Sequence, residues 1–105
     1  MLDYTQREKK FLTVKLADGR LLLLSPPKKS LYTTLSKMEK AIGETDDYEA
    51  IFEDVASLTA LILSNNKERE VITAAEVEEM MDFDDMFYLV SGYSVFAGEV
   101  IANPN

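Results

Sequence analysis

The fold is decided by the stretch FLTVKLADGRLLLL at residues 11–24. Apolar side chains at positions 12, 14 and 16 alternate with polar ones at positions 13 and 15, which is typical of a half-buried strand. Asp18-Gly19 tolerates the positive φ of a tight turn, and Leu21 to Leu24 form the returning strand. The stretch therefore predicts a β-hairpin. Because the returning strand is apolar on both faces, we expect helices to cover one face and another segment or a partner to cover the other.

The segments on either side of the hairpin differ in kind. Residues 1–10 are polar and charged, with little apolar periodicity, and are predicted to be a flexible arm. After the hairpin, Ser25-Pro26-Pro27 ends the strand because neither proline can donate to a ladder. Apolar stripes at helical spacing then predict four helices, over about residues 28–42, 47–64, 74–81 and 84–101. The predicted fold class is α+β: an N-terminal β-hairpin followed by about four helices, packed in one small domain over residues 11–105.

Capping signals support these helix starts. Asp82 or Asp84 is suited to cap the last helix, where acids also favour the positive end of the helix dipole. Gly92 and Gly98 fall inside the last helix, and we expect local bending or close packing there. Two earlier starts show the spacing of a capping box, Asp46 with Glu49 and Thr73 with Glu76.

Composition limits the class of protein. The chain has 105 residues, enough for one core, and no stretch approaches the roughly 20 apolar residues of a membrane span. No secretory signal is seen at the N-terminus, and the absence of cysteine rules out disulfides and thiolate metal sites. We therefore expect a cytoplasmic protein that does not enter a membrane.

The charges are distributed unevenly along the chain. Residues 1–40 carry nine basic and four acidic side chains, a net +5, whereas residues 41–105 carry two basic and fifteen acidic ones, a net −13. Such asymmetry can join the two halves within one fold, or pair the acidic face of one copy with the basic face of another; alternatively, both faces are simply solvated. Because a domain of this size gains stability from self-association, a homo-oligomer is expected. The overall negative sign disfavours nucleic-acid binding.

The sequence offers little for catalysis. It has no histidine and no cysteine, which removes the commonest general base, metal ligand and thiol nucleophile, so we expect a non-enzyme with no catalytic residues and no cofactor. Asp82, Asp84 and Asp85 form the densest acidic cluster, but they lack the glycine and distal glutamate of a calcium loop, and we predict no metal site. These three acids, together with Lys28 and Lys29, are candidates for electrostatic contacts with a partner.

Large flexible apolar side chains crowd residues 80–96, and Tyr88 is among them. They are more numerous than one helix face buries in a small domain, and methionine-rich aromatic surfaces adapt to varied apolar partners. Two interpretations are open: these side chains all pack in the core, or some form an exposed binding surface. The candidate partner-binding residues are Met80, Met81, Phe83, Met86, Phe87, Tyr93 and Phe96.

Several short motifs follow one another in a characteristic order. They are FLTVKL (11–16) with its Asp18-Gly19 turn, PPKK (26–29), ILSNNK (62–67) followed by Ile72-Thr73, VEE (77–79), MDFDD (81–85) and YSVF (93–96). Their order and spacing, from Phe11 to Asn105, resemble the small tail assembly chaperones of long-tailed bacteriophages and prophages of Gram-positive bacteria.

This resemblance implies a protein of the bacterial host cytoplasm that binds the tape measure protein, keeps it soluble during tail assembly and is absent from the mature virion. Other tail proteins are further possible partners, and the family supplies no active-site residues to transfer. The expected mechanism is that several copies bury helical segments of the tape measure protein against the Met/Phe/Tyr surface. The alternative is an acidic regulatory or inhibitory protein, for example a DNA mimic, that targets a host protein; the strongly acidic residues 41–105 favour it.

Overall fold

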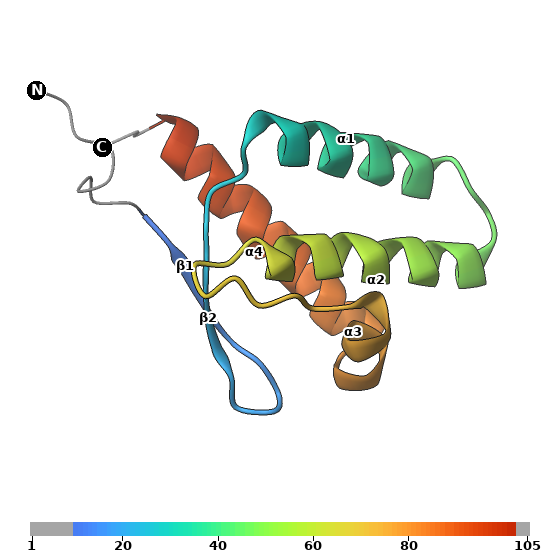
Figure 1. The fold of residues 1–105 in the computed structure, drawn as a ribbon. Coiled ribbons are helices and arrows are strands. Elements are labelled where there is room, and N and C mark those ends of the chain that lie inside the picture. Colours follow the sequence, from blue (N-terminus) through green and yellow to red (C-terminus); the bar gives the residue numbers. More distant parts are fainter. Residues whose placement is uncertain (1–9, 103–105) are drawn as a thin grey trace, which may run out of the picture.

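The computed structural model describes residues 10–102, so the predicted arm lies, apart from Lys10, outside the described residues. The chain forms a two-stranded antiparallel hairpin followed by four helices, and the predicted α+β fold is confirmed (Figure 1). The elements are β1 (Leu12–Lys15), β2 (Leu21–Leu24), α1 (Lys29–Gly43), α2 (Tyr48–Ser64), α3 (Ala74–Met80) and α4 (Phe83–Ala102).

The hairpin forms as its sequence pattern predicts. Leu12 lies opposite Leu24 and Val14 opposite Leu22, so these four side chains share one face of the sheet. That face points into the core, where Leu22 and Leu24 are fully buried. Gly19 adopts a φ of 94° in the turn, a conformation that an L side chain rarely adopts.

The outer edge of β2 is covered by the connection between α2 and α3. The backbone N–H of Ser25 donates to the carbonyl of Asn65 at 2.8 Å, and that of Lys67 donates to the carbonyl of Leu23 at 2.9 Å. The N–H of Leu23 donates in turn to the carboxylate of Glu68 at 3.0 Å. A loop thus takes the place of a third strand beside β2, and the outward backbone groups of Leu23 are hydrogen-bonded.

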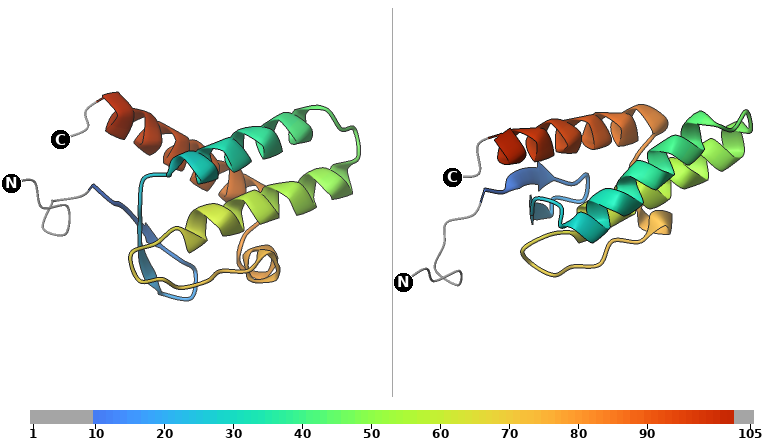
Figure 2. Two further views of the ribbon diagram at one scale, coloured as in Figure 1. Left: turned by 45° about the horizontal axis from the view of Figure 1, so that its top comes forward. Right: turned by 90° about the horizontal axis from the view of Figure 1, so that it is seen from above.

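Helix α2 is the centre of the domain and packs against α1, α3, α4 and β2. Figure 2 shows α1 and α2 side by side and antiparallel, with α4 crossing on another side of α2. Because α2 has neighbours on several sides, it is buried over most of its circumference rather than along one stripe. Its buried residues are Val55, Ala56, Leu58, Thr59, Ala60, Ile62 and Leu63.

The start of α2 corrects one sequence prediction. The cap is Asp47, not Asp46: its Oδ1 accepts hydrogen bonds from the backbone N–H groups of Glu49 at 3.0 Å and Ala50 at 3.3 Å. The helix begins one residue later than the capping-box spacing indicates, and only the residue directly before it can reach these two donors. Thr73 caps α3 as predicted.

The glycines of α4 also differ from expectation. A methyl group at Gly92 or Gly98 would meet no atom of the described chain within 4 Å. Of the two expected alternatives, bending or close packing, close packing at these glycines is therefore wrong, because both lie on exposed sides of the helix.

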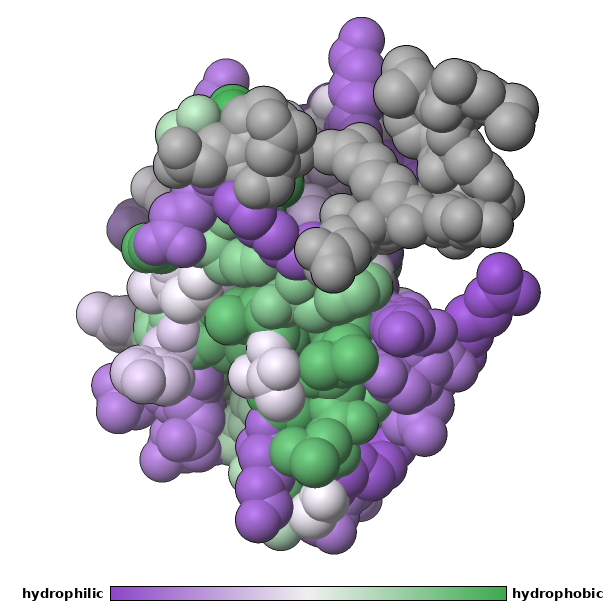
Figure 3. All heavy atoms as spheres, turned by 90° about the vertical axis from the view of Figure 1, so that its left-hand side faces the viewer, coloured by the Kyte–Doolittle hydropathy of each residue, from purple (hydrophilic) through white to green (hydrophobic). Residues whose placement is uncertain are grey.

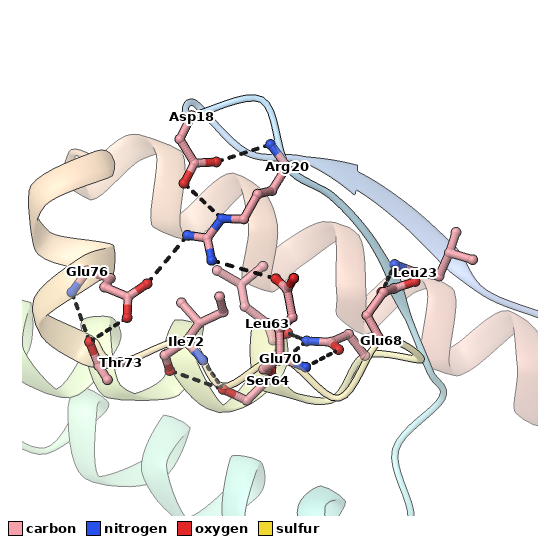
Figure 4. A network of polar contacts seen from close by, with 11 residues as sticks. Asp18, Arg20, Leu23, Leu63, Ser64, Glu68, Glu70, Ile72, Thr73 and Glu76 are labelled. Atoms are coloured by element: carbon pink, nitrogen blue, oxygen red, sulfur yellow. Dashed lines mark hydrogen bonds and ion pairs between the residues drawn. The ribbon is translucent and has the colours of Figure 1, made fainter.

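Arg20 ties the hairpin to the segments that follow α2 (Figure 4). Its guanidinium lies 2.8 Å from the carboxylate of Asp18, 3.6 Å from that of Glu70 and 3.4 Å from that of Glu76. Hydrogen bonds from the backbone N–H and side chain of Arg20 hold the pKa of Asp18 below its ordinary value. These pairs are partly exposed, so their main effect is to fix the orientation of the loop and α3 rather than to add much stability.

Candidate binding groove

Three of the predicted partner-binding residues lie in the hydrophobic core. Met86, Tyr93 and Phe96 are buried on the side of α4 that faces the rest of the domain. They recur at steps of seven and three residues, which keeps them on one side of a helix. This placement removes their side chains from the candidate binding surface.

Tyr93 has a specific structural role. Its hydroxyl donates to the carbonyl of Ser25 at 2.7 Å and accepts from the side-chain amide of Asn65 at 3.2 Å. Asn65 also donates to the carbonyls of Ser25 and Pro26. These contacts join α4, the end of α2 and the exit from β2, and burial raises the pKa of the Tyr93 hydroxyl.

Replacing Tyr93 by phenylalanine should lower the free energy of unfolding by about 1 kcal/mol at neutral pH, because the hydrogen bond to Ser25 is lost. Since folding raises the pKa of Tyr93, its stabilising effect is present below the unfolded-state pKa of about 10 and is lost as pH rises through the folded-state pKa. Urea unfolding at about pH 7 and about pH 11 should therefore show the difference between wild type and Tyr93→Phe shrinking at the higher pH. A difference that is equal at both pH values would contradict this role.

A second group of predicted residues forms an aromatic cluster on the flank of α4 next to α2. The ring of Phe83 lies 6.1 Å from that of Phe52 and 4.6 Å from that of Phe87, measured between centroids. Phe83 and Phe87 remain partly exposed. Because they pack on each other and on Phe52, much of their apolar area is already covered within the domain.

The remaining predicted residues, Met80 and Met81, line a groove of about 750 Å³ between β1 and α4, which we call the β1–α4 groove. Figure 3 shows the side of the molecule on which the hairpin lies, with a hydrophobic area at its centre bordered by hydrophilic side chains. The strand side of the groove is the run Leu12–Ala17. The helix side is formed by Asp85, Tyr88, Leu89, Ser91, Gly92 and Val95.

Two side chains on the helix side are unusually exposed for their type. Tyr88 retains 84% of its accessible surface and Val95 retains 62%. They lie seven residues apart, two helical turns, and therefore project from the same flank of α4. The groove thus presents apolar area to solvent where a partner can reach it.

The acids near the groove cap the N-terminus of α4. Asp82 accepts a hydrogen bond from the backbone N–H of Asp85 at 2.8 Å, and Asp85 accepts one from the N–H of Asp82 at 3.1 Å. This reciprocal arrangement confirms Asp82 as a cap. Asp84 is exposed in the first turn, and no group of three acids among residues 10–102 is arranged to hold a metal ion.

The two candidate lysines lie elsewhere. Lys28 and Lys29 are exposed at the beginning of α1, and neither lines the β1–α4 groove. The structure therefore brings Met80, Met81 and Asp85 together but does not bring these lysines to them.

Sequence patterns did not identify the strand side of the groove. The alternation in residues 11–16 predicts a strand, but it gives no sign that Leu12 and Val14 lie at an open edge. Tyr88 belongs to the crowded apolar side chains of residues 80–96, but the pattern does not mark it or Val95 as a binding residue, since a single exposed apolar residue on a helix is common. One sequence signal does point to an uncovered flank. The helix at α4 is apolar on more sides than a small domain can cover.

Comparisons of the chain with protein-family models, curated proteins and solved structures gave no match. Within the described part of the chain, no helix has the length and apolar character needed to span a bilayer. Function is therefore inferred from the groove and from the motif resemblance.

Proposed function

We propose that this protein is a phage or prophage tail assembly chaperone that binds apolar segments of the tape measure protein in the β1–α4 groove and keeps that protein soluble during tail assembly. The observation that carries the proposal is the groove itself: an open, largely apolar depression with Tyr88 and Val95 exposed at its side. The order of the sequence motifs supports the same conclusion.

The groove has the chemistry of a holding site rather than of a reaction site. Met80 and Met81 have long unbranched side chains that adjust to different apolar surfaces, which suits a client with many non-identical segments. The charged side chains at the groove are Lys15 and Asp85, and Asp85 is engaged in capping α4. We therefore propose a non-catalytic role.

The alternative of an acidic regulator or DNA mimic requires acids arranged as an exposed, phosphate-like array. Several acids instead have partners within the domain: Glu68 accepts from the N–H of Leu23, and Glu70 and Glu76 pair with Arg20. These contacts favour the chaperone over the mimic.

A tape measure protein is long and offers many apolar segments, so several copies of a small chaperone would act on one client, either independently or as a homo-oligomer. We place this activity in the cytoplasm of the bacterial host, with release before the virion is complete. Other tail proteins are secondary candidates as partners.

Co-expression tests this function. The client to test is the tape measure protein of the same phage or prophage, and its soluble fraction should rise severalfold when the chain is co-expressed, because bound apolar segments cannot aggregate. The control is an unrelated acidic protein of similar size. Equal solubility of the client with either protein would exclude the proposed function.

A further inference from the structure

The β1–α4 groove is bordered by backbone hydrogen-bonding groups as well as by apolar side chains. The N–H of Leu16 donates to the carbonyl of Arg20 at 2.8 Å. Hydrogen-bonded pairs alternate along an antiparallel ladder, so Val14–Leu22 and Leu12–Leu24 are the next two such pairs. The N–H and C=O groups of Thr13 and Lys15 therefore point away from β2, toward the groove.

The two edges of the hairpin differ in their backbone hydrogen bonding. Residues 65–68 cover the edge of β2, as described above, and bond to its outward groups at Leu23. Within residues 10–102, no segment hydrogen-bonds to the outward backbone groups of Thr13 and Lys15. β1 also contains no proline, glycine or bulge that would discourage strand pairing.

The groove follows this open edge along its whole length. Six consecutive residues, Leu12–Ala17, line it, whereas a groove above one face of a strand would be lined by alternate residues. Leu12 and Val14 project on the core face, on the same side of the sheet as α4. A strand added to β1 would therefore place every second side chain between these residues and the exposed flank of α4.

The charges of the helix side indicate the chemistry of the occupant. On the α4 side, Asp85 lines the groove and Glu99 lines the adjoining hollow; the same hollow is also lined by Lys10, which lies just before β1. Among the described groove residues, Lys15 is the one cation, and it comes from β1. A segment with apolar residues in alternation and basic residues at its ends complements this acidic flank.

We propose that the groove binds the client in extended conformation, as an additional strand on β1, and that the preferred segments alternate apolar residues and carry lysine or arginine at their ends. This inference rests on the proposed function and replaces the expected helical client segment with an extended one. β1 spans about 13 Å, so it pairs with about four client residues. The backbone supplies affinity that does not depend on the client's sequence, which a holding protein with many client segments requires.

A second copy of the chain fits the groove less well. Pairing β1 with β1 of another copy would bring a second α4, with its own Asp85 and Glu99, to the same sheet face, and Lys10 and Lys15 of that copy would offset these acids only in part because the whole copy is acidic. The chain's net charge of −8 opposes such pairing further. A single client segment with basic ends brings neither a second α4 nor the net negative charge of a second copy.

Amide hydrogen exchange of the wild-type chain tests the inference. The probe is a synthetic peptide of about ten residues, alternating valine and threonine between terminal lysines. At saturation, it should slow exchange at Thr13 and Lys15 by about tenfold or more, while Val14, already bonded to β2, changes little. The control is the same peptide with its central amides N-methylated, which keeps the side chains but cannot pair as a strand, and it should have no effect.

Each other outcome overturns the inference. Unchanged exchange at Thr13 and Lys15 would exclude strand addition, as would equal effects of the two peptides. Slow exchange at these amides in the free chain would show that the edge is already occupied, and slowing that grows with the chain's own concentration would assign the edge to a second copy. If co-expression rescue succeeds while these amides do not respond, the chaperone function stands and only the extended mode of binding fails.

Discussion

Replacing Met86 by aspartate is expected to leave the chain unfolded. The Met86 side chain has 0% of its surface exposed and lies in the core cluster with α2 and the hairpin. An unpaired carboxylate at such a site costs several kcal/mol, on top of the lost apolar contacts, whereas a domain of this size is stable by only about 5–15 kcal/mol. Circular dichroism should show loss of helix, and the cooperative thermal transition should disappear.

Two further variants make this result interpretable. Met86→Leu keeps the volume and apolar character and should cost less than about 1.5 kcal/mol. Tyr88→Asp, two residues away on the exposed flank, adds the same charge and should melt close to wild type. A cooperatively folded Met86→Asp protein would show that this side of α4 is not in the core.

The contrast between Met86 and Tyr88 shows what the sequence can and cannot reveal about α4. The periodicity of apolar residues places a helix at residues 83–102 to within about two residues, because caps and breakers are local signals. The helix is apolar on several sides, however, and its sequence alone does not show which side packs against α2. Met86 and Phe87 are adjacent and chemically similar, yet one is buried and the other partly exposed.

The hairpin illustrates the same limit. Alternation and the Asp18-Gly19 turn are sufficient to predict β1 and β2, since both depend on residues close in the chain. The cover on β2 comes from residues about 40 positions downstream, as the contact between Ser25 and Asn65 shows. Which edge stays open is therefore a property of the tertiary fold, and so is the groove that forms there.

The second large effect is expected on client binding, from substitutions on the helix side of the β1–α4 groove. Placing aspartate at both Tyr88 and Val95 puts two carboxylates where an apolar client segment would pack. Burying a charge against an apolar surface costs a few kcal/mol, and about 1.4 kcal/mol already lowers affinity tenfold. The double variant should therefore lose client binding while remaining folded, because both side chains are exposed in the free chain.

The chain provides a matched control for this variant. Tyr48 and Val71 are 86% and 76% exposed, and neither lines the β1–α4 groove. Tyr48→Asp with Val71→Asp thus makes the same two substitutions, with the same change in net charge, at a distance from the proposed site. Thermal unfolding of both double variants should confirm that each is folded before client binding is compared.

The most direct test of the groove is the soluble fraction of the tape measure protein when it is co-expressed with each double variant. We predict that the Tyr48/Val71 variant keeps the client as soluble as wild type does, and that the Tyr88/Val95 variant leaves it as insoluble as when it is expressed alone. Equal rescue by both folded variants would show that the β1–α4 groove is not where the client binds.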